Sequence, residues 1–282
     1  MRLFHTHSEL RPFLQQNRCK GQKIGLIPTM GALHEGHLSL VKQAKAQGDF
    51  AVASIFVNPT QFNNPEDLEK YPRNLEKDLA MLEGAGCDAV FAPSASEMYP
   101  EPASLRIDFG TLETELEGRF RPGHFAGVGL VVSKLFNIVQ PDQAYFGQKD
   151  LQQYYVIEKL VKQLSFPISL HRVPIMREDH GLAMSSRNER LSAADRQEAG
   201  LLYQALQQAR ESLLAQNGVE AARTLVAELI NSSARLELEY FEVIDIRDFK
   251  PLNEINEKAF TALCIAAEIG EVRLIDNLLL IS

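Results

Sequence analysis

The sequence predicts an α/β protein: a doubly wound parallel sheet with a smaller C-terminal α+β domain. First, short apolar runs at residues 24–27, 51–57, 88–93 and 144–146 are separated by segments whose apolar residues recur at helical spacing. This alternation is typical of βαβ units. Second, two helical patterns and then three strand patterns fill the region after residue 194, as in an α+β module. Third, 282 residues suffice for two domains.

We place the first domain at residues 1–176. Residues 24–27 form an apolar run that we expect Pro28 to end. Leu38 and Val41 are spaced as in a helix, and residues 51–57 form the next buried strand.

A polar loop at residues 58–65 follows this strand. Pro65 with two acids after it is typical of the first turn of a helix, which we expect to run in segments to about residue 83. A strand over 88–93 ends at Pro93, and residues 94–123 are expected to be irregular.

Valine, leucine and phenylalanine recur every three to four residues over 127–139, which indicates a buried helix. A short strand at 144–146 opens into Gly147 and three polar residues, and a helix is expected over 151–164. Residues 168–174 alternate in polarity and end at Pro174, as a strand does.

The second domain is placed at residues 177–282. Leucine and alanine share one face of each helix expected at 195–216 and 219–231. Apolar segments at residues 236–246, 260–269 and 273–281 predict three strands.

The charge distribution excludes some functions. Net charge is −8; residues 1–177 carry 19 basic and 19 acidic side chains, so the acidic excess lies entirely in residues 178–282. An acidic chain without a basic block argues against nucleic acid and anionic membranes as partners. No apolar run is long enough to span a bilayer, and the first residues lack the apolar region of a signal peptide. Three widely spaced cysteines without a CxxC pair predict reduced thiols in a cytoplasmic protein.

The stretch PTMGALHEGH, residues 28–37, joins a predicted strand to a predicted helix. The first N–H groups of a helix and its macrodipole favour anions, and Gly31 and Gly36 allow a ligand to approach the backbone closely. The turn therefore predicts a phosphate site. Two alternatives stay open from the pattern alone: His34 and His37 are satisfied structural groups, or they are half of a metal site, although HExxH spacing is absent.

Other candidate residues follow predicted strands. Gln61 lies in the loop after residues 51–57, at the sheet edge where α/β proteins bind ligands. Lys149 follows the strand at 144–146, and the tripeptide Ser185, Ser186 and Arg187 offers two hydroxyls and a forked cation suited to phosphate oxygens. Each of these residues alone is more often an ordinary surface or turn residue. Asp78 lies in a helix as most solvated acids do, and it is also our candidate Mg²⁺ ligand.

Six motifs in order resemble the pantoate–beta-alanine ligase family of the HxGH nucleotidyltransferase superfamily. They cover nearly the whole chain and are far more specific together than HxGH alone. The motifs are PTMGALHEGHLSL at 28–40, FVNPTQF at 56–62, YPR at 71–73, HFAGV at 124–128, FGQKDLQQ at 146–153 and LAMSSRN at 182–188.

The resemblance implies a Rossmann-like first domain, a C-terminal lid domain and a homodimer. It also implies synthesis of pantothenate from pantoate, beta-alanine and ATP with Mg²⁺, through a pantoyl-adenylate. His34, His37, Lys149 and Arg187 would be catalytic, with His37 as proton donor, and Gln61 and Gln153 would hold pantoate. The residues from 184 to 187 resemble the mobile loop of this superfamily. ATP would be bound by Met30, Gly31, Ala32, Leu33, His34, Glu35, Gly36, His37, Gly147, Gln148, Lys149, Asp150, Met176, Met184, Ser185, Ser186 and Arg187.

The chemistry of the reaction suits these residue types. A carboxylate must attack the α-phosphate of ATP, so cations gathered on the transition state lower the barrier. Carboxamides hydrogen-bond hydroxyls without repelling a carboxylate, which suits Gln61 and Gln153 to pantoate. Gln148 stands where some members carry Glu, so its side chain is assigned no catalytic role. Three other hypotheses remain: a nucleotidyltransferase that releases a nucleotide conjugate, a silent nucleotide-binding module and a metallohydrolase.

Overall fold

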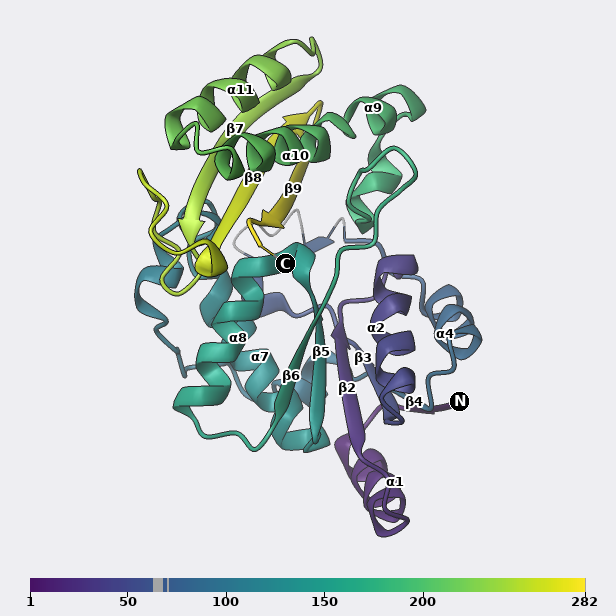
Figure 1. The fold of residues 1–282 in the computed structure, drawn as a ribbon. Coiled ribbons are helices and arrows are strands. Elements are labelled where there is room, and N and C mark those ends of the chain that lie inside the picture. Colours follow the sequence, from purple (N-terminus) through teal and green to yellow (C-terminus); the bar gives the residue numbers. More distant parts are fainter. Residues whose placement is uncertain (63–67, 70, 282) are drawn as a thin grey trace. The chain divides into compact units, whose positions relative to one another are not determined.

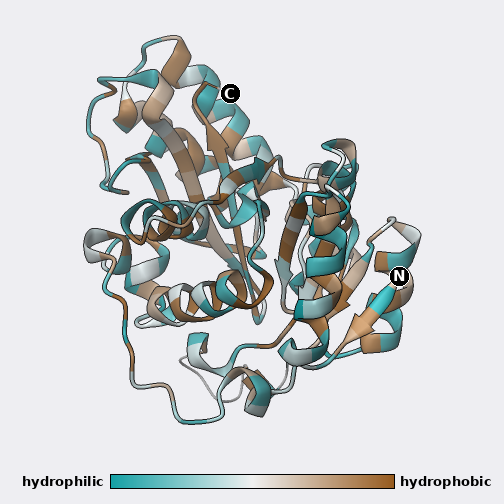
Figure 2. Cartoon of the chain, turned by 90° about the horizontal axis from the view of Figure 1, so that it is seen from below, coloured by the Kyte–Doolittle hydropathy of each residue, from teal (hydrophilic) through white to brown (hydrophobic). Residues whose placement is uncertain are grey.

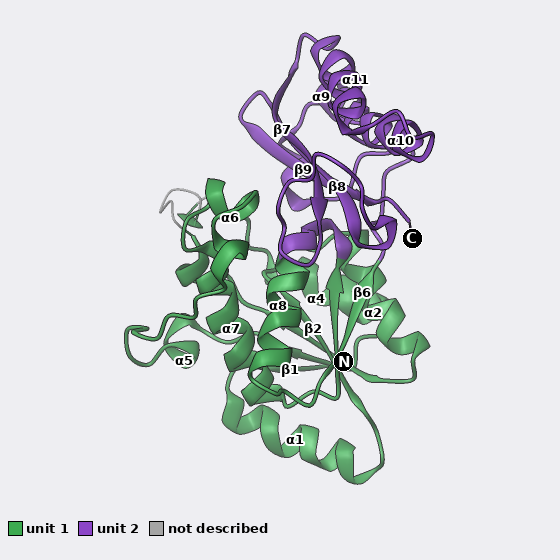
Figure 3. Cartoon of the chain, turned by 60° about the vertical axis from the view of Figure 1, so that its left-hand side comes forward, with its two compact units in different colours: residues 1–147, 153–173 green, residues 148–152, 174–282 purple. Residues whose placement is uncertain are grey.

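The computed structural model describes residues 1–62, 68–69 and 71–281, and they form two compact units. Unit 1 comprises Met1–Gly147 and Gln153–Val173, and unit 2 comprises Gln148–Gln152 and Pro174–Ser282 (Figure 3). The chain thus passes to the second unit at residue 174, three residues before the expected boundary. The short segment 148–152 also groups with unit 2, which a linear division of the sequence does not anticipate.

Unit 1 is built on six parallel strands in the order β1-β4-β3-β2-β5-β6. Helices α7 (His124–Val139) and α8 (Leu151–Gln163) lie on one side of the sheet, and α2 (Glu35–Ala46) and α4 (Leu75–Gly84) lie on the other (Figure 1). This is the doubly wound arrangement predicted. The strands are β1 (Arg2–Phe4), β2 (Ile24–Thr29), β3 (Phe50–Ile55), β4 (Ala89–Phe91), β5 (Gln143–Gly147) and β6 (Ser169–Val173).

The chain leaves β2 toward β3 on one side and later returns to β5 on its other side. Ligands of open α/β sheets bind beyond the carboxyl ends of the strands at such a switch point. The histidine turn follows β2 there, and Gly147 ends β5. The topology of unit 1 therefore places the predicted phosphate turn where a ligand is expected.

Several predicted boundaries need correction. Strand β2 continues through Pro28 to Thr29, because β5 pairs with β2 only at Gly25 and Leu26 and no ladder bond is lost at the proline. Strand β1 was not predicted, since a three-residue strand gives too little periodicity to detect. Helix α1 (His7–Cys19) was also not predicted; it contains Pro12, a residue that usually marks the end of a helix.

The segment 94–123, expected to be irregular, contains three short helical turns. The predicted helix start at residues 65–67 lies outside the described residues, and α4 begins at Leu75 with Asn74 as its cap. The three turns are α5 (Ala95–Met98), η2 (Gly110–Glu113) and α6 (Glu117–Phe120).

The core of unit 1 lies between the sheet and its helices. Leu26 and Ile27 on β2 are fully buried, as expected of a two-sided parallel strand. Figure 2 shows the strands as largely hydrophobic, whereas the helices alternate between hydrophobic and hydrophilic faces. Cys19 is exposed while Cys87 and Cys264 are buried, and all three are free thiols.

Unit 2 packs two helices against a three-stranded antiparallel sheet of order β7-β8-β9. The single helix expected at residues 195–216 is divided into α9 (Ala193–Glu198) and α10 (Leu201–Leu214) at Gly200. Among the described residues, no helix combines the length and apolar character needed to cross a bilayer. Unit 2 also contains α11 (Val219–Asn231), η5 (Lys258–Phe260), β7 (Leu236–Asp245), β8 (Thr261–Ile269) and β9 (Val272–Leu279).

Candidate active site

The turn after β2 has two consecutive residues in the left-handed region, with φ +80° at Gly31 and +50° at Ala32. A Cβ on Gly31 would lie 2.9 Å from Oδ2 of Asp78, so glycine is required both by the backbone angle and by space. Ala32 adopts a conformation that is costly for a residue with a side chain. Such a conformation persists only where neighbouring contacts hold it.

Asp78 provides those contacts. It is 1% exposed, and its carboxylate oxygens accept hydrogen bonds from the N–H groups of Ala32 (3.0 Å) and Leu33 (2.8 Å). Its interpretation as a solvated surface acid is therefore wrong. A buried carboxylate that accepts two backbone N–H groups is well satisfied.

These contacts do not favour Asp78 as a metal ligand. Both of its oxygens already face backbone donors. Within the part of the chain that the structure describes, no three His, Cys, Asp or Glu residues are grouped to hold a metal ion. The two backbone contacts thus disfavour Asp78 as a direct Mg²⁺ ligand, and that role of Asp78 stays an untested prediction.

The two histidines form the N-terminal cap of α2. Nδ1 of His34 accepts a hydrogen bond from the N–H of Gly36 at 3.1 Å, and Nδ1 of His37 accepts one from the N–H of His34 at 3.3 Å. Their ring centroids are 4.1 Å apart. Since each Nδ1 is an acceptor, the neutral form of each ring carries its proton on Nε2. The cap therefore provides two Nε2–H donors at a helix N-terminus, a chemistry suited to phosphate.

Gln61 is held at the carboxyl end of β3 by a buried polar network. It is 6% exposed; its Oε1 accepts from Nδ2 of Asn58 at 3.2 Å, and its Nε2 lies 2.9 Å from the sulfur of Met30. Tyr99 donates to Oδ1 of Asn58 at 2.9 Å and so fixes the orientation of that amide. The network joins the loop after β3 to the loop after β2.

Helix α7 packs against the loop after β3, which carries Gln61. Nδ1 of the buried His124 lies 3.0 Å from the carbonyl oxygen of Gln61. Because Arg121 donates a hydrogen bond to Nε2 of the same ring, the proton of His124 is on Nδ1, and this Nδ1–H donates to Gln61. A Cβ on Gly127 would lie 2.3 Å from the carbonyl oxygen of Thr60. The motif HFAGV therefore supplies a close helix–loop contact, an arrangement that its apolar periodicity did not reveal.

In unit 2, the segment 148–150 (η3, Gln148–Asp150) is held by β9. Nδ2 of Asn277 donates to the carbonyl oxygens of Gln148 (3.0 Å) and Lys149 (2.9 Å). Nε2 of Gln148 returns a bond to Oδ1 of Asn277 at 3.3 Å. The Lys149 ammonium lies 3.4 Å from Asp150.

The segment before the SSR tripeptide forms a narrow turn that Arg177 braces. Met184 donates its N–H to the carbonyl of Met176 at 2.9 Å, and Arg177 donates to the carbonyl of Gly181 at 3.1 Å. Arg177 also forms two bonds to the buried Asp276, at 2.6 and 3.0 Å, and stacks on the ring of Tyr203. Burial raises the pKa of the Asp276 carboxyl, and the Arg177 guanidinium opposes that rise.

The SSR tripeptide opens the short helix η4 (Ser186–Arg190). Oγ of Ser185 accepts from the N–H of Arg187 at 3.2 Å, and Arg187 is exposed. Asn188 is buried and donates to Glu178 at 2.9 Å, so the end of the motif is anchored. For the carboxyl of Glu178, burial raises the pKa, but hydrogen bonds from Arg196 and Asn188 outweigh it and lower the pKa overall.

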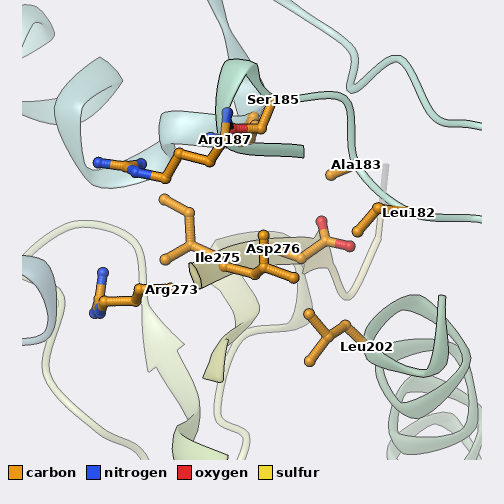
Figure 4. A pocket seen from close by; sticks show the side chains of 10 residues that line it. Leu182, Ala183, Ser185, Arg187, Leu202, Arg273, Ile275 and Asp276 are labelled. Carbon is orange, nitrogen blue, oxygen red and sulfur yellow. Dashed lines mark hydrogen bonds between the residues drawn. The ribbon is translucent and has the colours of Figure 1, made fainter. Parts of the chain in front are cut away.

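One pocket of unit 2 brings several predicted residues together. Lys149, Ser185 and Arg187 line it with Arg273 and Asp276. Figure 4 shows the Asp276 carboxylate directed toward Leu182, below the loop that carries Ser185 and Arg187. Cations from residues far apart in the sequence therefore share one pocket.

The other predicted residues have mixed surroundings. Glu35 is exposed and pairs with Lys42 at 3.1 Å, and Leu33 is 2% exposed in the core. Gln153 is half-buried in the first turn of α8. Gly36, Gly147, Gln148, Met184 and Ser186 are half-buried, whereas Asp150 and Met176 are exposed.

Sequence reasoning missed five residues that hold candidate residues within their own unit: Asn58 and His124 in unit 1, and Arg177, Asp276 and Asn277 in unit 2. Two of them form an adjacent polar pair within the apolar run 273–281. A polar pair inside a predicted strand was the available signal, because buried polar groups need partners.

A doubly wound sheet with a histidine-capped helix at its switch point places this chain among the α/β proteins that offer a phosphate site at a helix N-terminus. The family model for pantoate–beta-alanine ligase matches residues 2–279. The chain belongs to the pantoate–beta-alanine ligase family, whose members are ATP-dependent ligases of pantothenate biosynthesis.

Curated relatives agree over nearly their full length. The chain is 47% identical to the pantothenate synthetase of Cytophaga hutchinsonii over 274 residues, covering 97% of each chain. It is 48% identical to that of Thermoanaerobacter sp. (strain X514) over 275 residues, covering 96% of each.

Solved structures share the fold. The pantothenate synthetase of Thermus thermophilus has a TM-score of 0.92 at 42% identity and covers 99% of both chains. The pantoate-beta-alanine ligase of Francisella tularensis, whose structure was solved with beta-gamma ATP and beta-alanine, has a TM-score of 0.80 at 36% identity, covering 100% of this chain and 98% of that one.

Proposed function

We propose that this chain condenses pantoate with beta-alanine at the expense of ATP, through a pantoyl-adenylate, and releases AMP and pyrophosphate. One observation carries the phosphate part of this proposal: His34 and His37 cap α2 through Nδ1, so that the proton of each neutral ring lies on Nε2. The family relationship supports the substrates.

The first step forms a bond between a pantoate carboxylate oxygen and the α-phosphorus of ATP, and breaks the bond to the β-phosphate. Charge builds on the leaving pyrophosphate. We propose that the Nε2–H donors of His34 and His37 interact with this charge more strongly in the transition state than in the ground state. For Lys149 and Arg187, the family relationship supports a catalytic role of the same electrostatic kind. Of the two histidines, His37 is the proposed proton donor.

Pantoate is the proposed ligand of Gln61 and Gln153. The Oε1 of Gln61 already accepts from Asn58, so the orientation of its amide is fixed before substrate arrives. A fixed amide loses little freedom on binding, which favours alignment of the carboxylate with the α-phosphorus.

In the second step, the amine of beta-alanine attacks the acyl carbon of the adenylate. The carbon–oxygen bond to AMP breaks, and the amine loses its proton as the amide forms.

An Mg²⁺ ion bound to the ATP phosphates would supply further positive charge. Because Asp78 is occupied by backbone donors, no step is routed through a metal held by the protein.

The proposal also covers the rest of the nucleotide, the assembly and the compartment. Asp150 would bind the ribose of ATP, and the residues from 184 to 187 would contact its phosphates. We also propose a homodimer in the cytoplasm. The three free thiols are compatible with a reducing compartment.

The test uses pantoate-dependent exchange between ATP and pyrophosphate. His37→Asn keeps a polar atom near the position of Nδ1, able to accept the His34 N–H, but removes Nε2. We expect this variant and Lys149→Ala to lose exchange by orders of magnitude while the unfolding midpoint stays close to that of the unaltered chain. Near-normal exchange in both variants would remove the proposed site.

Product analysis separates the other hypotheses. With ATP, Mg²⁺, pantoate and beta-alanine, the ligase yields AMP and an amide with the mass of pantothenate. A stable nucleotide conjugate would instead indicate a transferase, and ATP binding without turnover a silent binding module. One tightly bound zinc per chain would indicate a metallohydrolase.

A further inference from the structure

We propose that Asn277 and Asp276 on β9 are positioning residues that set the two cation-bearing segments of unit 2, Asn277 through the backbone of Lys149 and Asp276 through Arg177. The inference rests on the proposed function for its consequence, binding of ATP, but the geometry lies wholly within unit 2.

Asn277 is matched to the segment it holds. It is 3% exposed, and the two hydrogens of its amide reach the carbonyl oxygens of consecutive residues, Gln148 and Lys149. Its own oxygen accepts from the Gln148 side chain at 3.3 Å. All three hydrogen bonds join Asn277 to Gln148 or Lys149. They therefore fix the backbone position of Lys149.

Asp276 holds the other segment. It is 4% exposed, its Oδ1 accepts the N–H of Asn277 at 2.7 Å, and both of its oxygens bind Arg177. Arg177 in turn binds the carbonyl of Gly181 in the turn that leads into Ser185. A buried carboxylate destabilises the fold unless it is paired and hydrogen-bonded. Asp276 meets this condition through Arg177 and the N–H of Asn277.

Adjacent residues of a strand point to opposite faces. The pair at 276 and 277 can therefore reach two different segments from one place on β9. The pocket that Asp276 lines also contains Lys149, Ser185 and Arg187. One edge strand thus fixes the spacing between the predicted phosphate ligands of unit 2.

The principal variant is Asn277→Asp. It keeps the size of the side chain but places a carboxylate oxygen against two carbonyl oxygens, which repel it. Asn253→Asp is the matched control, because it makes the same change at an exposed position of the same unit. Asp276→Asn tests the second segment by weakening its bidentate contact with Arg177.

Hydrogen exchange of the whole chain provides the first measurement, and it requires no activity. Asn277→Asp should raise amide exchange at residues 147–152 and leave residues 176–190 unchanged, whereas Asp276→Asn should do the reverse. Asn253→Asp should change neither. Equal rises in both segments for both variants, or no rise in either, would overturn the positioning role.

The affinity for ATP, measured by calorimetry without pantoate, gives the second measurement. We expect Asn277→Asp to weaken ATP binding about tenfold in the unaltered chain, but less than about twofold when Lys149 is already alanine, because the effect acts through Lys149. Equal losses in both backgrounds would show an independent structural effect and refute the inference.

The two proposals fail separately. If the unaltered chain neither binds ATP nor supports exchange with pyrophosphate, the proposed function fails, and hydrogen exchange still decides the positioning role. If the unaltered chain is active but Asn277→Asp changes neither local hydrogen exchange nor ATP affinity, only the positioning role fails.

Discussion

Gly127→Ala is the most direct test of how α7 positions the substrate loop. The added Cβ would lie 2.3 Å from the carbonyl oxygen of Thr60 and 2.7 Å from the Cα of Gln61. These are backbone atoms, so no side chain can rotate away to make room. Restoring an ordinary contact requires the loop to move by about 1 Å.

A shift of this size has two separable effects. Overpacking a buried contact lowers the free energy of unfolding by about 1–3 kcal/mol. Displacing Gln61 by about 1 Å misaligns the proposed pantoate carboxylate and lowers kcat/KM for pantoate by about 10- to 100-fold. ATP binding should change much less, because the histidine cap is held by bonds within its own turn and touches the displaced loop only through the contact of Gln61 with Met30.

Gly129→Ala on the same helix is the matched control. Its Cβ would lie 2.6 Å from the ring of the buried Phe109, so it is overpacked to a similar degree but against a side chain away from Gln61. Urea denaturation measures stability, and pyrophosphate release at varied pantoate measures kcat/KM. We expect both variants to lose stability and only Gly127→Ala to lose kcat/KM for pantoate.

The comparison can refute the reasoning in two ways. A folded Gly127→Ala protein with the kcat/KM of the unaltered chain would show that the loop position does not matter to Gln61. Equal losses of kcat/KM in both variants would show that the effect follows from general destabilisation rather than from displacement of the loop.

Other expectations follow from single contacts. Asp78→Asn should lower the free energy of unfolding by about 1.5–3 kcal/mol, since an amide N–H would face a backbone N–H. The Mg²⁺ dependence of the remaining activity should stay unchanged. A shifted Mg²⁺ dependence would favour a ligand role for Asp78. Burial raises the pKa of the Cys87 thiol to about 11, so iodoacetamide at pH 8 should label the exposed Cys19 in the native protein and leave Cys87 unlabelled, as mass spectrometry would show. The Glu178 pKa is lowered from 4.5, so its contribution to stability is complete above that pH and is lost as pH falls below it; Glu178→Gln should flatten this part of the stability–pH curve, and an unchanged curve would contradict the assignment.

Local sequence patterns were sufficient to predict the elements whose burial follows directly from the spacing of apolar side chains. The periodic valines of α7 and the two-sided apolar runs of β2 and β3 predicted buried elements because burial follows from side-chain spacing. The histidine turn was placed correctly after a strand and at a helix start. The division of the helix at Gly200 was missed. A Cβ there would lie 2.6 Å from the carbonyl oxygen of His180, so glycine is needed for a tertiary contact that the local sequence does not show.

The sequence by itself determined the α/β class, the order of the larger elements and the family, since these depend on periodicity and on motifs that are local in the chain. Only the tertiary structure decided that Asp78 braces the turn at residues 32 and 33, that α7 sets Gln61, and that β9 holds Lys149. Each of these contacts joins residues more than 40 positions apart. Such a partner is chosen by folding and leaves no mark in the local pattern of charge or hydropathy.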